Sequence, residues 1–209
     1  VMLVVAGTAL WLGGTIWSIF VLAIAAGVMW EWARLALRMT QSPGMRIVWI
    51  AGGIVYITFA ARMLTYVRSL EPDGLVGTLV IMAAVIAVDI GAYFAGRTIG
   101  GPKIAPRISP SKTWAGLGGG IVGATVVIAL YQAQSTSTIY GCLPGATRSG
   151  YSGLACANSW STILLPALVA GSIIAVVAQA ADFFESWMKR RAGVKDSSAL
   201  IPGHGGLFD

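Results

Sequence analysis

Three side chains near the end of the sequence have types and a spacing suited to phosphate chemistry. Asp182, Ser186 and Lys189 step by four and three residues, so they share one face of a helix, with Glu185 beside them. Mg²⁺ prefers a few carboxylate oxygens together with substrate phosphates, and lysine or arginine neutralises charge that develops in phosphoryl transfer. If the helix continues through Arg191, this face presents a carboxylate, a hydroxyl and an ammonium in order along the axis. The pattern therefore indicates a phosphate and metal site rather than a basic lipid anchor.

A second polar group is the stretch "SPSKT", residues 109–113, which comes directly before an apolar run. Its amides and hydroxyls gather at a predicted helix N-terminus, which is a natural anion site. An ordinary N-cap followed by a membrane span explains the same residues, so both interpretations stay open here. The candidate anion-binding residues are Ser109, Ser111, Lys112 and Thr113.

An acidic residue, Asp89, lies inside an apolar run about six residues from its end. At about 1.5 Å per residue this places it roughly 9 Å into the membrane. An isolated carboxylate there costs at least ~2.5 kcal/mol even on lenient scales. A protonated packing residue and a cation ligand are both compatible with Asp89, and the acids Asp182 and Glu185 near the end of another run favour the cation site.

The elements that must position these residues are membrane-spanning helices. Hydrophobic residues make up 56% of the 209 residues and charged ones only 11%, far below the ~25% charged of average soluble domains. A helix needs about 20 apolar residues to cross a bilayer, and a shorter apolar piece, 1–12, is interpreted as the tail of a truncated span. The sequence predicts an all-α, polytopic transmembrane bundle in one integral membrane domain, 1–209, with full spans at 15–33, 46–66, 75–95, 115–133 and 162–185.

Basic residues alternate between the predicted loops. Eleven of the fourteen fall in 34–46, 96–113 and the tail, and three fall in the intervening loops. The positive-inside bias then places the basic loops, including the signature segment 186–209, in the cytoplasm and the 134–160 loop outside. A net charge of +6 therefore needs no nucleic-acid partner, because topology and contact with anionic lipid or nucleotide account for it.

Two smaller patterns have structural explanations. Cys142 and Cys156 lie in the predicted external loop, where a disulfide and two free thiols are both open. Gly118, Gly120 and Gly123 match G-x-G-x-x-G, but they open an apolar run instead of following a strand. Close packing between helices is the better interpretation of these glycines.

The tail carries a resemblance to a known family. Ser186, Lys189-Arg190, Lys195-Asp196, Ser198, Pro202 and His204-Gly205-Gly206, ending at Asp209, resemble the signature of the phosphatidate cytidylyltransferases (CDP-diacylglycerol synthases). The segment 89–114 is similar to the other polar segment of that family, and Trp30-Glu31-Trp32 is similar to its early span end. The resemblance covers essentially the whole chain.

Two departures accompany the resemblance. The family signature continues past Asp209 to a second aspartate and a final span, so the chain is interpreted as a fragment lacking both ends, inactive on its own if that acid is essential. Ala115 stands where many members carry glutamate, so that acid has no counterpart here.

The resemblance implies the reaction of CTP with phosphatidate to give CDP-diacylglycerol and pyrophosphate. It implies that Asp182 and Asp209 hold Mg²⁺, and a second cation such as K⁺ is compatible with the site. Asp89 is a candidate either for the metal or for orienting Lys112. The implied catalytic residues are Asp182, Ser186, Lys189 and Arg190. The implied substrate-binding residues are Ser109, Ser111, Lys112, Thr113, Lys195, Asp196 and His204, with the 109–113 loop closing the site. A role of His204 in shaping the turn between its glycine neighbours stays open.

The expected location is the bacterial inner membrane, with the site facing the cytoplasm, where CTP is available. The partners are CTP, phosphatidate and membrane lipids, and the sequence leaves the oligomeric state open, a homodimer included. A CTP-dependent polyprenol or lipid kinase and an ion-coupled transporter remain the alternatives. The D-G-x-x-A-R pattern of the alcohol phosphatidyltransferases is absent from the sequence.

Overall fold

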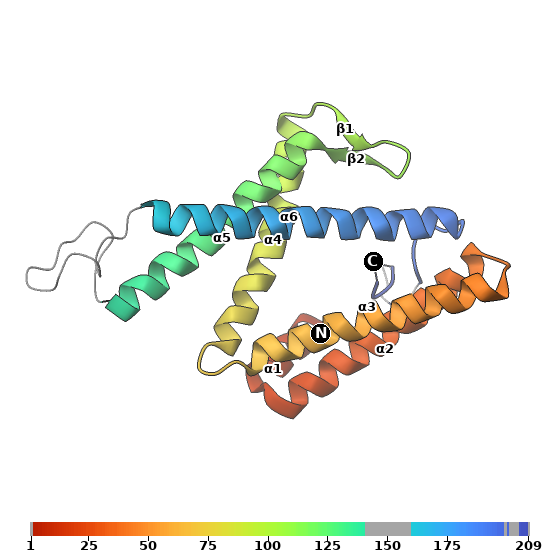
Figure 1. Ribbon diagram of the computed structural model, residues 1–209, viewed down its shortest axis with the longest axis horizontal. Coiled ribbons are helices and arrows are strands. Elements are labelled where there is room, and N and C mark those ends of the chain that lie inside the picture. The colour runs from red at the N-terminus through yellow and green to blue at the C-terminus, as the bar shows by residue number, and fades with distance from the viewer. Residues whose placement is uncertain (1, 141–159, 199, 201–204, 209) are drawn as a thin grey trace, which may run out of the picture. The chain divides into compact units, whose positions relative to one another are not determined.

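The protein is described here from a computed structural model, which covers residues 2–140, 160–198, 200 and 205–208, with side chains from 4 to 135 and from 163 onward within those ranges. Its elements are almost all helical (Figure 1). In chain order they are α1 (Met2–Leu12), α2 (Gly14–Met39), α3 (Pro43–Ser69), α4 (Gly74–Thr98), β1 (Lys103–Ala105), β2 (Ser109–Thr113), α5 (Trp114–Tyr140) and α6 (Trp160–Arg191).

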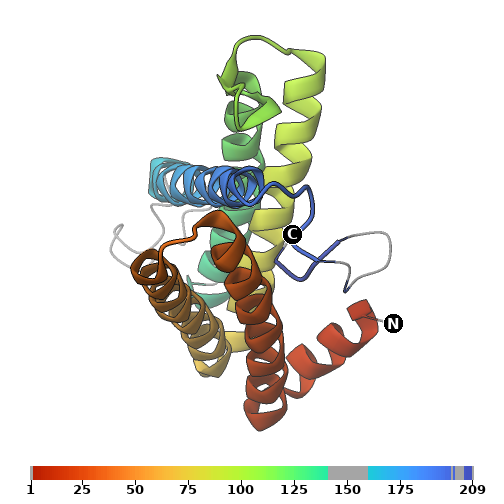
Figure 2. The same cartoon turned by 90° about the vertical axis from the view of Figure 1, so that its right-hand side faces the viewer.

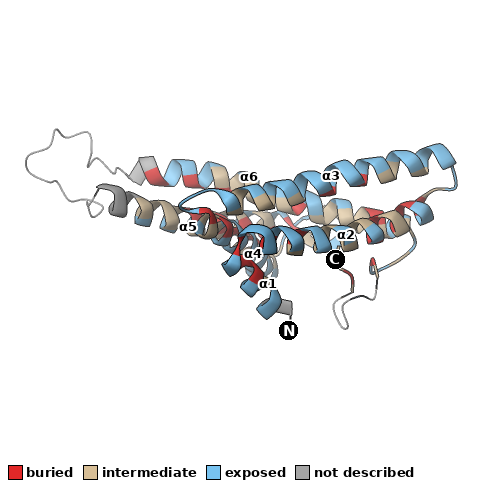
Figure 3. Cartoon of the chain, turned by 90° about the horizontal axis from the view of Figure 1, so that it is seen from below, coloured by how far each residue is buried: buried red, intermediate tan, exposed pale blue. Residues whose placement is uncertain are grey.

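Five of the described helices, α2 to α6, are long and apolar enough to cross a membrane. Large apolar side chains such as Ile47, Phe59 and Leu130 are exposed on them, and exposed residues run along the helices in Figure 3. An apolar surface of this kind suits lipid, where helices satisfy their own backbone groups. The prediction of an all-α polytopic membrane protein is confirmed. The helices are longer than the predicted spans, and α5 continues to Tyr140, into the predicted 134–160 loop.

The chain divides into two compact units: unit 1 is Val1–Leu79 with Asp182–Asp209, and unit 2 is Val80–Ala181. In unit 1, α1 and α2 are separated at Gly13 and Gly14, which have φ of 65° and 51°. Arg68, near the end of α3, donates from Nε to the Leu10 carbonyl at 2.9 Å and from Nη2 to the Trp11 carbonyl at 3.3 Å. The guanidinium thus satisfies carbonyls that the end of α1 leaves without helical partners.

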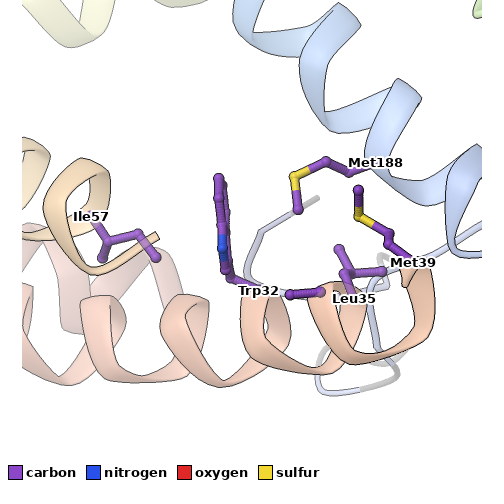
Figure 4. Packing of buried hydrophobic residues seen from close by; sticks show 6 residues of the cluster. Trp32, Leu35, Met39, Ile57 and Met188 are labelled. Carbon is purple, nitrogen blue, oxygen red and sulfur yellow. The ribbon is translucent and has the colours of Figure 1, made fainter. Parts of the chain in front are cut away.

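Helices α2 and α3 lie side by side in unit 1 (Figures 1 and 2). Trp32 joins them, because its Nε1 donates to the Trp49 carbonyl at 2.8 Å and its ring packs where Gly53 has no side chain. Figure 4 shows Trp32 with the buried residues Leu35, Met39, Ile57 and Met188. Through this cluster, the end of α2 that is predicted to face the cytoplasm packs against the last turns of α6, which belong to the same unit.

Unit 2 is held together by small residues. A Cβ on Gly119 of α5 would lie 3.0 Å from the Gly91 carbonyl carbon of α4, and one on Gly123 would lie 3.0 Å from the Ala87 carbonyl carbon. Such contacts let two backbones approach closely. The packing interpretation is confirmed for Gly120 and Gly123, whereas Gly118 has nothing within 4 Å of its Cβ position. Buried alanines of α4, α5 and α6 complete this core.

A short antiparallel hairpin follows α4 in unit 2 (Figure 1). Lys103 pairs with Thr113 and Ala105 with Ser109, with an irregular register between them. The stretch 109–113 was predicted as a loop, and it is instead the strand β2. Only one partner strand of three residues supports it, and Pro110 interrupts it, so the sequence carries little strand signal. The hairpin leads directly into α5, since the Trp114 amide donates to the Pro102 carbonyl at 3.2 Å.

Candidate functional site

A pocket of about 350 Å³ that contains charged and hydroxyl side chains lies in unit 2. It is built where the second half of α4 meets β2 and the first turn of α5, and α6 contributes one side chain. Four predicted site residues line it together: Asp89, Ser111, Lys112 and Thr113. Ser109 belongs to the same strand and is buried, but it does not line the pocket. The remaining lining residues are Ala92, Tyr93, Gly96, Arg97, Gly116 and Gln179.

Thr113 connects the pocket to the start of α5. Its hydroxyl accepts a hydrogen bond from the Gly116 amide at 3.0 Å, which is the geometry of an N-cap. The N-cap interpretation of the sequence is therefore confirmed for Thr113. The positive end of the helix dipole lies at the same place and favours an anion.

The charged groups around the pocket have both signs. Lys112 and Arg97 bring positive charge from β2 and α4, and Asp89 brings a carboxylate from the apolar part of α4. Arg97 is oriented by Tyr93, whose hydroxyl accepts from Nη1 at 3.1 Å. Cations paired with hydroxyls suit phosphate oxygens, whereas a carboxylate with hydroxyl neighbours suits a hard cation.

Gln179 of α6 is a pocket residue that sequence reasoning missed. It is 9% exposed, and among the described residues its Nε2 has no hydrogen-bond partner. A buried amide left without a partner is costly, so an acceptor on a bound molecule would stabilise it. The available signal was a single polar side chain between alanines in an otherwise apolar run, "AQAAD".

The second set of predicted residues lies in unit 1, on the last turns of α6. The helix does continue to Arg191, so Asp182, Ser186 and Lys189 share one face as predicted. Lys189 Nζ lies 2.6 Å from Glu185 Oε1. Arg190 is exposed.

Helix α6 ends in a turn that sends the chain into the tail. Gly193 has φ of 70°, and the Gly193 and Val194 amides donate to the Arg190 and Lys189 carbonyls at 3.1 and 3.0 Å. This is a glycine C-cap. Lys195 and Asp196 follow and are exposed.

Two predicted tail residues, His204 and Asp209, lie outside the described residues, as do Cys142 and Cys156. Within the described ranges no group of three or more His, Cys, Asp or Glu gathers that could hold a metal ion. Of the predicted metal ligands, Asp89 lies in unit 2 and Asp182 in unit 1. The metal site therefore stays a prediction.

Sequence reasoning also assigned no role to Glu31. This carboxylate of α2 is fully buried and accepts hydrogen bonds from four donors of the tail. The signal was a lone acid between two tryptophans near the end of a span.

Long apolar helices with a pocket lined by cations and hydroxyls are features of an integral membrane protein with a polar site. Comparison with known proteins identifies the family. The model of the cytidylyltransferase family matches residues 41–209, and the chain belongs to this family.

Several curated relatives carry the name phosphatidate cytidylyltransferase. The protein of Brucella suis biovar 1 is 38% identical over 165 residues, which is 77% of this chain and 51% of the relative. The protein of Rickettsia bellii is 31% identical over 200 residues, 96% of this chain and 75% of the relative. The protein of Haemophilus influenzae is 40% identical over 136 residues, 65% of this chain and 41% of the relative. The chain thus spans about half the length of the Brucella relatives that it matches.

Proposed function

We propose that the protein transfers the cytidylyl group of CTP to phosphatidate, giving CDP-diacylglycerol and pyrophosphate. The observation that carries this proposal is the pocket of unit 2, in which Lys112, Ser111 and Thr113 meet the N-terminus of α5, in a chain of the cytidylyltransferase family. Its relatives named phosphatidate cytidylyltransferase support the choice of lipid.

The reaction needs no nucleophile from the protein. A phosphate oxygen of phosphatidate attacks the α-phosphorus of CTP and forms the new phosphoanhydride bond. The bond between the α-phosphorus and the oxygen that bridges to the β-phosphate breaks, and pyrophosphate leaves with that oxygen. The task of the side chains is to hold the two phosphate groups in line and to offset their negative charge.

The residues divide this task by their chemistry. Lys112, Ser111 and Thr113 bind phosphate oxygens at the helix N-terminus, and Gln179 donates its amide hydrogens to the same ligand. Lys189 and Arg190 neutralise charge on the leaving pyrophosphate, while Ser186 donates a hydroxyl. Lys195, Asp196 and His204 are assigned to substrate by the resemblance.

Mg²⁺ fits the donors that the chain offers, because it takes one or two carboxylates plus substrate phosphates and not a full cage of protein ligands. Asp182, with Asp209 by resemblance, would hold it, and Asp89 is the candidate ligand within the pocket. When bound, the ion would offset charge on the phosphates during transfer. A second cation such as K⁺ stays an open part of this proposal.

The proposed location is the bacterial inner membrane, with the polar residues facing the cytoplasm. Eleven of the fourteen basic residues lie in the loops assigned to that side, as the positive-inside bias predicts. CTP is available there.

The test uses the intact protein in liposomes that contain phosphatidate and a polyprenol, with Mg²⁺ and CTP labelled at either the α- or the γ-phosphorus. Cytidylyl transfer puts the α-label into lipid and leaves the γ-label in pyrophosphate. A γ-label in lipid would instead identify a CTP-dependent lipid kinase. No label in lipid, together with CTP-independent ion uptake, would identify a transporter.

A further inference from the structure

Glu31 is a buried carboxylate near the end of α2, one of the helices able to span a membrane. Its exposed fraction is 0%. An ionised carboxylate removed from water is costly unless opposite charges or hydrogen bonds compensate it. Within the described chain, the donors that compensate Glu31 are neutral groups of the segment that follows α6.

Each carboxylate oxygen of Glu31 accepts two hydrogen bonds. Oε1 accepts from the Ser198 hydroxyl and from the Leu207 amide at 2.9 Å. Oε2 accepts from the Ser197 hydroxyl at 3.0 Å and from the Phe208 amide at 2.7 Å. Glu31 and these four donors form what is called here the tail clamp. Hydrogen bonds to an ionised acceptor are stronger than neutral ones, so the clamp ties two separate stretches of the tail to α2.

The packing around the clamp is shaped to admit the tail. A Cβ on Gly206 would lie 2.6 Å from each Glu31 oxygen, so a residue with a side chain could not occupy this position without displacing the carboxylate. Leu207 packs where Gly27, one turn earlier on α2, has no side chain. Phe208 meets Trp32 edge to face, with ring centroids 5.7 Å apart. The carboxylate is thus flanked by apolar contacts that exclude water.

We propose that Glu31 is a positioning residue for the transfer reaction: it holds the tail so that the polar residues adjoining the clamp are set for substrate. This inference rests on the proposed function. Asp196 directly precedes the clamp residue Ser197, and Asp209 directly follows Phe208. Glu31 itself has no exposed surface with which to touch a substrate, so its effect passes through the tail.

The decisive variant is Glu31→Gln in the intact protein. Glutamine keeps the shape of the side chain but replaces one acceptor oxygen with an amide NH₂ group. This group is itself a donor, so it cannot accept the hydrogen bonds from the tail. Hydrogen–deuterium exchange should then accelerate at the Leu207 and Phe208 amides by about tenfold or more, the effect of losing a charge-assisted bond. Amides in the middle of α3 report global unfolding and should keep their wild-type exchange. This readout does not depend on activity.

The second readout is turnover. Because a displacement of about 1 Å in a reacting group can cost about a hundredfold, kcat for CDP-diacylglycerol should fall by about that factor. The KM for CTP should change by less than about threefold, because the pocket of unit 2 is untouched. A purely structural role would lower the melting temperature without this division between kcat and KM.

Two further variants complete the design. Ser197→Ala combined with Ser198→Ala removes the two hydroxyl donors and leaves the carboxylate with the Leu207 and Phe208 amides. The exchange rates and kcat should therefore lie between those of wild type and Glu31→Gln. If Glu31→Gln does not fold, this double variant carries the test. Glu71→Gln makes the same chemical change at an exposed glutamate and should leave both readouts at wild-type values.

Two results would overturn the inference: unchanged exchange at Leu207 and Phe208 in Glu31→Gln, or faster exchange there with unchanged kcat. A wild-type protein that makes no CDP-diacylglycerol would overturn the proposed function and the catalytic part of this inference with it. The exchange measurement would still decide whether the clamp holds the tail.

Discussion

Lys189 Nζ lies 2.6 Å from Glu185 Oε1, one helical turn earlier on α6. The two side chains are 16% and 18% exposed, so the pair sits at the border between apolar surroundings and water. A glutamate four residues before a lysine is the favourable order for such a pair on a helix. Glu185 therefore directs the ammonium of Lys189 along the face that also carries Asp182 and Ser186.

Under the proposed function, Lys189→Ala should lower kcat for CDP-diacylglycerol at least a hundredfold, because it removes the charge assigned to offset the leaving pyrophosphate. The free energy of unfolding should fall by only about 0.5 kcal/mol, the value typical of such a pair. Label transfer and thermal melting in detergent measure the two effects. Arg191→Ala removes a positive charge from the same helix end and should keep its turnover. Retained activity in Lys189→Ala would contradict the role assigned to it.

Gln179→Leu should separate binding from stability. The variant removes a buried amide whose nitrogen has no partner among the described residues, so its melting temperature should equal or exceed that of wild type. The KM for CTP should rise about tenfold if the amide donates to the bound phosphate. Gln134→Leu, an exposed change on α5, is the matched control. An unchanged KM in Gln179→Leu would remove this residue from the site.

Thr113→Val should lower both the stability of the folded protein and its affinity for substrate. Loss of the N-cap hydroxyl, which accepts from the Gly116 amide, typically costs about 1 kcal/mol. The same change leaves the first turn of α5 less ordered, so the KM for CTP should rise. Thr113→Ser keeps the hydroxyl and should behave as wild type in both melting and kinetics. A valine variant as stable as the serine variant would show that the cap is not needed.

Gly119→Ala and Gly118→Ala should have opposite effects on stability. A methyl group at Gly119 would clash with the Gly91 carbonyl group, whose carbon lies 3.0 Å from the Cβ position, and overpacking of this kind typically costs about 1–3 kcal/mol. Gly118 has nothing within 4 Å, so alanine there should stabilise α5 by up to about 1 kcal/mol. Thermal melting of the two variants gives the comparison. Equal melting temperatures would contradict the close packing of α4 and α5.

The sequence predicts the helical framework well because membrane spans are defined by length and apolarity alone. It predicts the face shared by Asp182, Ser186 and Lys189 for a related reason: helical spacing is a local property. Asp89 and Lys112 line one pocket, and their roles in a site stay predictions. The helical framework and the face shared on α6 depend on the order of residues over a few turns.

The parts that the sequence does not predict depend on contacts between distant residues. Glu31 and Ser197 are 166 positions apart, and nothing local relates them. Gln179 resembles any polar residue in a span until its neighbours in the pocket are known. The β-hairpin is not predicted because "SPSKT" has no strand-like pattern. Gly119 is not predicted as a packing residue because the G-x-G-x-x-G match includes Gly118 in its place.

The tail clamp has a consequence for how the protein is made. Synthesis runs from the N-terminus, so α2 reaches the membrane with its carboxylate long before the matching donors exist: Phe208 is added 177 positions after Glu31. Until then Glu31 depends on water, a proton or the insertion machinery to offset its charge. A chain that ends before Ser197 therefore keeps an acid in an early helix without the donors that the tail supplies to it.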